Sequence, residues 1–106
     1  MAIRTFAAID VGSFELEMGI YEMSYKTGIR RVDHIRHVIA LGKDTYSGGK
    51  ISYGLVEEMC QVLEEFVQIM KSYKVKDYRA YATSAMREAH NRQIILDQIR
   101  VRTGLT

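Results

Sequence analysis

The chain has 106 residues, of which 47% are hydrophobic and 26% are charged, a length and composition that suit one soluble domain with a single core. Lys and Arg number 15 against 13 Asp and Glu, and the formal net charge of +2 argues against nucleic acid or an anionic membrane as a partner. No apolar run approaches the roughly 20 residues of a membrane helix, the N-terminus lacks a signal-peptide pattern, and a single cysteine excludes an internal disulfide, so we expect a cytoplasmic protein.

The first 41 residues have the patterns of three strands. Residues 3–9 are mostly apolar and are followed by Asp10-Val11-Gly12-Ser13, which predicts a buried strand that enters a tight turn. Residues 14–23 alternate between apolar and polar side chains, which is typical of a half-exposed strand. Residues 29–41 are rich in β-branched side chains and follow a turn signal at residues 26–28. Short turns between the three strands predict an antiparallel meander.

The remaining elements follow in chain order. The alternation of the third strand slips near residues 33–35, where we expect a β-bulge. Residues 42–50 are rich in glycine and polar side chains and predict a loop. Ser52 is a typical N-cap, and the apolar side chains from residue 55 to residue 73 recur at spacings of three and four, which predicts a long amphipathic helix. Residues 75–82 predict a short fourth strand.

The C-terminal segment predicts helix after this fourth strand. Asn91 is expected to cap a second stretch of it, and Gly104 suits its end. The predicted order is therefore β-β-β-α-β-α, which indicates an α/β fold with a mixed sheet. Because a βα unit normally returns to the sheet, we expect the chain to lack the final strand of its fold.

A first candidate site is the tetrapeptide Asp-Val-Gly-Ser between the first two predicted strands. Gly12 permits a tight turn and a close approach of the backbone to a ligand, and the N–H groups of such a turn with Ser13 could cradle a phosphate. Asp10 would then need a Mg²⁺ ion or a water between its carboxylate and the phosphate. The alternative is a plain hairpin turn, because such tetrapeptides are common.

A second candidate site begins where the fourth predicted strand passes into helix. Ser84, Arg87 and Asn91 lie at relative positions 0, +3 and +7, which places them on one face of a continuous helix. Ser84 falls near the helix start, where free N–H groups favour an anion, and Arg87 could add a bidentate contact to a phosphate. The alternative is a capped surface helix with a solvated arginine.

The other reactive side chains favour structural roles. His34 and His37 are an odd number of residues apart, so in a strand they point to opposite faces and cannot share one metal ion. His90 stands alone in the sequence, and Cys60 lies beside the apolar face of the long helix, where a packed thiol is expected.

Three segments together resemble the N-terminal part of the exopolyphosphatase / guanosine pentaphosphate phosphohydrolase (Ppx/GppA) phosphatase family. They are F-A-A-I-D-V-G-S, L-G-K-D-T-Y-S-G-G-K-I-S and A-T-S-A-M-R-E-A-H-N. The resemblance covers essentially the whole chain and implies a ribonuclease-H-like lobe of the actin, heat-shock-70 and sugar-kinase superfamily. Residues 1–106 would then be a partial N-terminal lobe of a two-lobed phosphatase.

The resemblance also implies an activity. Members of this family use Mg²⁺ to release terminal phosphate from inorganic polyphosphate or guanosine pentaphosphate, and the full-length protein is expected to be a homodimer. The general-base Glu of the family would fall beyond Thr106, so the isolated chain is expected to be inactive. The residues that match the phosphate-binding positions of the family are Gly12, Ser13, Thr83, Ser84, Arg87 and Asn91, with Asp10 as the metal ligand, directly or through water.

One departure from the family pattern bears on this activity. Phe14 and Glu15 stand where the family usually has Asn-Ser, which removes small polar groups beside the phosphates and adds an anion. This departure leaves open a non-catalytic module of the same superfamily that binds nucleotide or polyphosphate. A related ATP-dependent kinase is a further alternative, because the superfamily shares the Asp-x-Gly turn, although the segment A-T-S-A-M-R-E-A argues against it.

Overall fold

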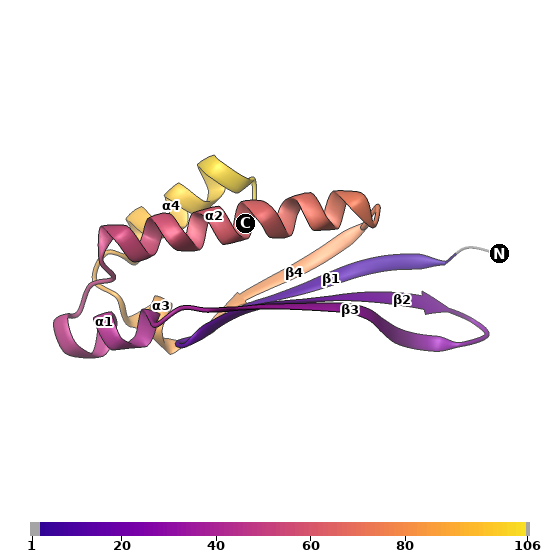
Figure 1. The fold of residues 1–106 in the computed structure, drawn as a ribbon, viewed down its shortest axis with the longest axis horizontal. Coiled ribbons are helices and arrows are strands. Elements are labelled where there is room, and N and C mark those ends of the chain that lie inside the picture. Colours follow the sequence, from indigo (N-terminus) through magenta and orange to yellow (C-terminus); the bar gives the residue numbers. More distant parts are fainter. Residues whose placement is uncertain (1–2, 106) are drawn as a thin grey trace.

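The computed structural model describes residues 3–105 as a four-stranded sheet with its two longest helices over one face (Figure 1). The elements are β1 (Arg4–Val11), β2 (Glu15–Ser24), β3 (Gly28–Val38), α1 (Leu41–Gly48), α2 (Tyr53–Ser72), β4 (Asp77–Ala82), α3 (Ser84–Glu88) and α4 (Arg92–Thr103). The predicted α/β class and the long helix are confirmed. The helix begins as expected, since the Ser52 Oγ accepts a hydrogen bond from the Leu55 N–H.

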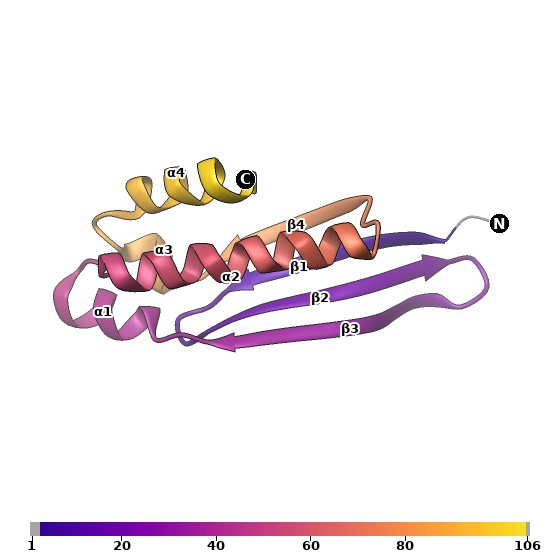
Figure 2. The same ribbon diagram turned by 45° about the horizontal axis from the view of Figure 1, so that its top comes forward.

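The sheet is mixed, with the strand order β3-β2-β1-β4. β1 pairs antiparallel with β2, β2 pairs antiparallel with β3, and β4 joins β1 in parallel. The predicted meander is therefore confirmed, and α2 makes the crossover that a parallel pair requires. The parallel pairing brings the carboxyl ends of β1 and β4 to the same end of the sheet, where α1 and α3 also lie (Figure 2). Among residues 3–105, no strand pairs with the outer edge of β4.

One local prediction is wrong: residues 42–50 are not a loop, because α1 occupies most of that segment. After β4 the helix comes in two stretches, since α3 ends at Glu88 and α4 begins at Arg92, directly after Asn91 as expected. The expected β-bulge is present beside residue 33: Ile20 pairs with Asp33 and Tyr21 with Arg31, which leaves Val32 as the extra residue.

The core lies between the sheet and the helices. Alternate residues of each central strand face α2, and the face of α2 toward the sheet is apolar, as the spacing of its hydrophobic residues requires. The largest fully buried side chains are Phe66, Ile9, Leu16, Met18, Ile20, Leu41, Ile51, Met59, Leu63, Met86, Ile95 and Cys60.

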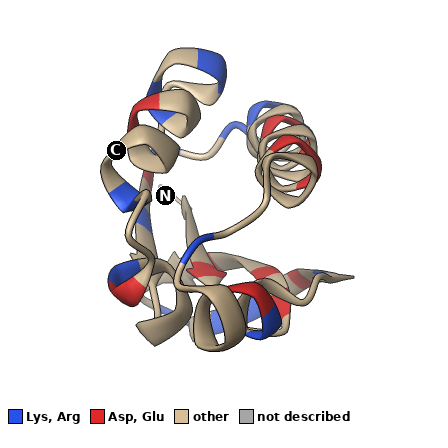
Figure 3. Cartoon of the chain, turned by 90° about the vertical axis from the view of Figure 1, so that its left-hand side faces the viewer, with Lys and Arg blue, Asp and Glu red and all other residues tan. Residues whose placement is uncertain are grey.

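Helix α4 packs beside α2 above the sheet, as the view along the sheet in Figure 3 shows. Arg102 of α4 joins the two helices, with ion pairs of 2.7 Å to Glu57 and 2.6 Å to Glu64. Cys60 is fully buried in α2, and its burial raises the pKa of the thiol, so the predicted packed cysteine is confirmed. Within residues 3–105, no helix combines the length and the hydropathy that a membrane span requires.

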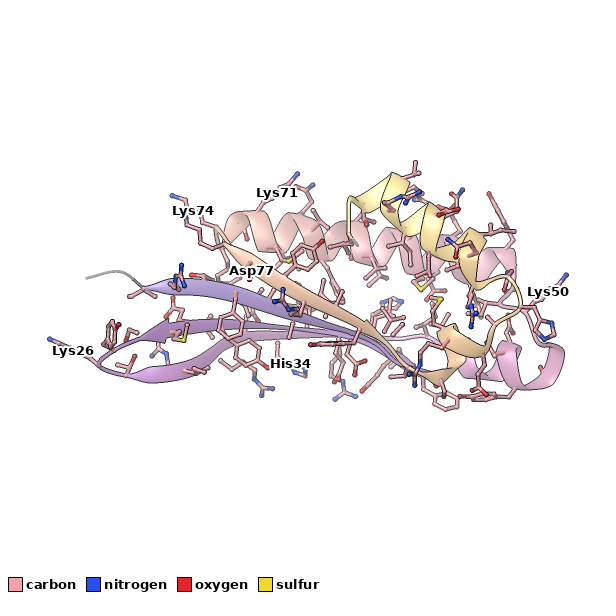
Figure 4. The ribbon with its side chains drawn as sticks, turned by 180° about the vertical axis from the view of Figure 1, so that it is seen from behind. Lys26, His34, Lys50, Lys71, Lys74 and Asp77 are labelled. Carbon is pink, nitrogen blue, oxygen red and sulfur yellow. The ribbon has the colours of Figure 1, made fainter. Side chains whose placement is uncertain are left out.

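Within residues 3–105, no helix covers the opposite face of the sheet. Figure 4 shows His34 on this open face, where its ring lies 3.4 Å from the Glu17 carboxylate. His37, three residues on, instead pairs at 2.7 Å with Glu58 of α2. The two histidines therefore point to opposite faces, as predicted. Figure 4 also places Lys26 at the far hairpin and Lys50 at the end that carries α1 and α3.

Candidate phosphate-binding site

The turn between β1 and β2 is closed by backbone hydrogen bonds. The Gly12 N–H donates to the Glu15 carbonyl at 2.9 Å, and a Cβ added at Gly12 would lie 2.9 Å from that oxygen. A side chain at this position would force the turn apart, which explains the glycine. Because the Gly12 N–H is used within the turn, it is not one of the donors that could point at a phosphate. The Ser13 carbonyl accepts a 2.7 Å hydrogen bond from the Gly42 N–H, which attaches α1 to the turn.

Thr83 ties the ends of the two parallel strands together. Its N–H and its Oγ1 both donate to the Val11 carbonyl, at 3.0 and 3.2 Å. The hydroxyl proton of Thr83 is therefore engaged by the backbone. These two hydrogen bonds hold Ser84, the first residue of α3, close to the β1–β2 turn that contains Ser13.

Ser13 and Ser84 are linked through Tyr46 of α1. The Tyr46 hydroxyl lies 2.5 Å from the Ser84 Oγ and 3.4 Å from the Ser13 Oγ. The two candidate sites found in the sequence are therefore brought together at one end of the sheet. Sequence reasoning missed Tyr46, because its segment was expected to be a loop. The L-G-K-D-T-Y motif was visible, but nothing in it marks the tyrosine.

Arg87 provides an available positive charge at this end. Its residue is exposed, and its guanidinium makes no hydrogen bond or ion pair with any part of the chain that the structure describes. Its carbonyl accepts a 2.6 Å hydrogen bond from Arg92 Nη1, which fixes the backbone at the end of α3. An arginine with a fixed backbone and a guanidinium that has no partner in the protein can bind an anion such as phosphate. Because α3 has five residues, its dipole adds little to this attraction.

Asn91 does not share a helix face with Ser84 and Arg87, so that prediction is wrong. The backbone leaves the helical region at Ala89, with φ −66° and ψ 133°. The Asn91 side chain donates to the Ile51 carbonyl at 3.0 Å and accepts from the Ile51 N–H at 3.2 Å. It precedes α4 without making a side-chain cap. Its amide therefore joins the α1–α2 connection to the α3–α4 connection, and a role in binding phosphate stays a prediction.

Asp10 lies on the open face of the sheet. It is exposed, and its neighbours Ile9 and Val11 point into the core. Its register partner on β2 is Glu17, whose carboxylate faces His34 at 3.4 Å and Arg36 at 3.9 Å. No group of three or more Asp, Glu, His or Cys side chains that could hold a metal is found within residues 3–105. A Mg²⁺ ion is commonly held by one or two carboxylates together with substrate phosphates, and Asp10 suits such an ion as a single ligand.

Comparisons with known proteins agree with the sequence motifs. The sequence model of the Ppx/GppA phosphatase family matches residues 20–106. Exopolyphosphatase 1 of Mycobacterium tuberculosis is 27% identical over 97 residues, which cover 92% of this chain and 28% of that protein. Exopolyphosphatase 1 of Mycobacterium leprae is 29% identical over 98 residues, with 92% and 29% covered. The chain thus spans less than a third of the length of these relatives.

Solved structures show the same fold. The crystal structure of the Aquifex aeolicus member of the Ppx/GppA family matches with a TM-score of 0.94 and 27% identity, over 99% of this chain and 34% of that one. An exopolyphosphatase from Cytophaga hutchinsonii matches with a TM-score of 0.90 and 22% identity, over 96% and 32%, which supports the fold alone. The fold is thus part of a ribonuclease-H-like lobe of the actin-like kind. With the family model and the solved structures in agreement, this chain belongs to the Ppx/GppA phosphatase family.

Proposed function

We propose that this chain forms the phosphate-binding part of the N-terminal lobe of a two-lobed phosphohydrolase. The whole protein would release terminal phosphate from inorganic polyphosphate or guanosine pentaphosphate. The observation that carries the proposal is that Ser13 and Ser84 meet through Tyr46 where β1 and β4 end, with Arg87 in the same short helix as Ser84 and its guanidinium unpaired within residues 3–105. Ligands of α/β sheets bind at this end of parallel strands. The relatives named exopolyphosphatase support polyphosphate as the substrate class.

The residues suggest how the site would treat a phosphate chain. The Arg87 guanidinium would neutralise the phosphoryl oxygens and strengthen its contact as negative charge shifts in the transition state. The linked Ser13 and Ser84 hydroxyls would donate one hydrogen bond to the same group and so orient it. Asp10 would hold Mg²⁺ directly or through water, and when bound that ion supplies further neutralisation of the phosphate oxygens. The general base is expected outside these 106 residues, so the isolated chain should bind phosphate and not hydrolyse it.

The test is phosphate release by the natural full-length protein in the presence of Mg²⁺. Arg87→Ala should lower kcat/KM for polyphosphate by about 100-fold or more, because a positioned charge at the transferring group is lost. Arg100→Ala is the matched control, since Arg100 is an exposed α4 arginine paired with Asp97 at 3.3 Å. It should leave the rate within about twofold, as expected for a surface ion pair. Unchanged turnover in Arg87→Ala would remove this arginine from the site.

A second candidate function is a binding module without hydrolysis. The exposed Phe14, which stands with Glu15 where the family usually has Asn-Ser, favours it. Calorimetry and phosphate release on the same full-length protein separate the two functions. Tight binding of guanosine pentaphosphate or polyphosphate without release would support the module, and release of phosphate at a steady rate would support the enzyme. Size-exclusion chromatography and cell fractionation would test the homodimer and the cytoplasmic location that we also propose.

A further inference from the structure

Tyr46 links the two serines of the site by its hydroxyl group. The Tyr46 Oη lies 2.5 Å from Ser84 Oγ and 3.4 Å from Ser13 Oγ. The three side chains come from α1, α3 and the β1–β2 turn, which lie together at one end of the molecule (Figure 1). Since both serines are proposed ligands of phosphate, the tyrosine is placed to control how they present their protons. This inference therefore rests on the proposed function.

The position of Tyr46 is fixed by bonds to the same two segments. The Gly42 N–H donates to the Ser13 carbonyl at 2.7 Å, and the buried Thr45 hydroxyl donates to the Ala85 carbonyl at 2.8 Å. A Cβ added at Gly42 would lie 3.0 Å from the Ser13 Cβ and 3.1 Å from the Tyr46 ring. α1 thus packs closely against the turn, and a larger residue at position 42 would require Ser13 and Tyr46 to shift by a few tenths of an ångström. Tyr46 stays 56% exposed, and both hydrogen bonds of its hydroxyl are open to solvent.

The number of protons in this group has a consequence for binding. Three hydroxyls carry three donor protons, and their two mutual hydrogen bonds use two of them. One proton remains to donate outward, from a chain whose geometry α1 holds. Without the Tyr46 hydroxyl, both serines would rotate freely and hydrogen-bond to water. A phosphate would then have to order them at its own entropic cost.

We infer that Tyr46 is a positioning residue, whose hydroxyl orders the Ser13 and Ser84 hydroxyls so that one serine donates its proton to a bound phosphate chain. The contact to phosphate is made by a serine, and the tyrosine acts through it. A merely structural tyrosine would affect folding stability instead. Because its hydrogen bonds are exposed to water, the hydroxyl should matter little to stability and more to binding.

The experiment uses Tyr46→Phe in the natural full-length protein, with inorganic tripolyphosphate as the probe in calorimetry and polyphosphate as the substrate in kinetics. Tyr53→Phe is the matched control, because this tyrosine is 84% exposed in the first turn of α2. Tyr46→Phe should raise both the dissociation constant and KM about three- to tenfold, as expected for the loss of one or two hydrogen bonds. The kcat should change by less than about twofold, since the phosphate itself is not bound by the ring.

A double-mutant cycle with Ser84→Ala tests whether Tyr46 acts through the serine. The double variant should lose clearly less affinity for tripolyphosphate than the sum of the two single losses, because the effect of Tyr46 that passes through Ser84 is already gone. Fully additive losses, an unchanged dissociation constant in Tyr46→Phe, or a fall in its unfolding temperature that Tyr53→Phe does not share would each overturn the inference and leave the proposed function standing. Failure of the wild-type protein to bind tripolyphosphate would overturn both.

Discussion

A buried hydrogen bond helps to attach α1 to α3, and the effect of removing it can be predicted in magnitude. The Thr45 side chain is 6% exposed, and its Oγ1 donates to the Ala85 carbonyl at 2.8 Å. Thr45→Val keeps the shape of the side chain and its helix propensity, and it leaves a carbonyl of the fully buried Ala85 without this donor. Such a loss costs about 1–3 kcal/mol. We therefore expect α1 to open more often in the variant.

Hydrogen exchange measured by mass spectrometry reports this opening directly. A cost of about 1–3 kcal/mol corresponds to about a 5- to 150-fold loss of protection for the amides of residues 41–51. Ser47→Ala is the matched control in the same helix, because the Ser47 hydroxyl is exposed and bonds within α1 to the Lys43 carbonyl. It should change protection by less than about threefold. Equal protection in Thr45→Val and wild type would refute the role given to this hydrogen bond.

Three further predictions concern the rest of the fold. Asn91→Ala removes two hydrogen bonds to the Ile51 backbone and should lower the free energy of unfolding in urea by about 1–3 kcal/mol. The hydrogen bond from the Tyr73 hydroxyl lowers the pKa of Asp33, so Tyr73→Phe should raise that pKa in an NMR titration. In the wild type, folded Asp33 has a lower pKa than unfolded Asp33 and so binds fewer protons. The Tyr73–Asp33 hydrogen bond therefore stabilises the fold above about pH 4, and this stabilisation is lost as the pH falls through the pKa of folded Asp33. Burial raises the pKa of the Cys60 thiol, so at pH 8 a disulfide reagent should modify it at least about tenfold more slowly in the native state than in urea.

The elements with a strong periodic pattern could be predicted from the sequence. Leu16, Met18 and Ile20 alternate with polar residues, and all three are completely buried in β2. The apolar side chains of α2 recur at helical spacing and are buried on one face, and Ser52 caps the helix as expected. These are local signals, because one face of each element must meet the core whatever the rest of the chain does.

α1 could not be predicted in this way, because tertiary contacts select it. Of its eight residues, Leu41, Gly42 and Thr45 are buried, which is too little for a periodic signal. Its glycines favour a loop by propensity. What holds the segment as a helix is its bonding to the β1–β2 turn and to α3. The role of Tyr46 in the candidate site could not be predicted for the same reason, because Tyr46 belongs to this helix.

The break between α3 and α4 has a similar cause. No glycine or proline interrupts the segment, and Asn91 is the one signal in the sequence for a second helical stretch. In the structure the His90 N–H donates to the Gly49 carbonyl at 2.7 Å in place of a helical partner. Gly49 adopts a φ of +77°, and a Cβ there would lie 2.7 Å from the His90 ring. The helix is interrupted for about one turn, and in its place a hydrogen bond links the α1–α2 connection to the α3–α4 connection.

Phe14 and Glu15, which stand where the resemblance leads us to expect Asn-Ser, differ in their surroundings. The Glu15 carboxylate lies on the open face of the sheet and pairs with Arg36 at 3.0 Å, so its negative charge is balanced there. Phe14 stays 60% exposed at the turn beside Ser13, and its carbonyl accepts from the Ile39 N–H at 3.0 Å. The charge of Glu15 should therefore repel a bound phosphate only weakly. At position 14, however, the chain has no small polar side chain that could contact the phosphate. We expect Phe14→Asn in the full-length protein to raise the rate of phosphate release from polyphosphate, and Glu15→Ser to change that rate little.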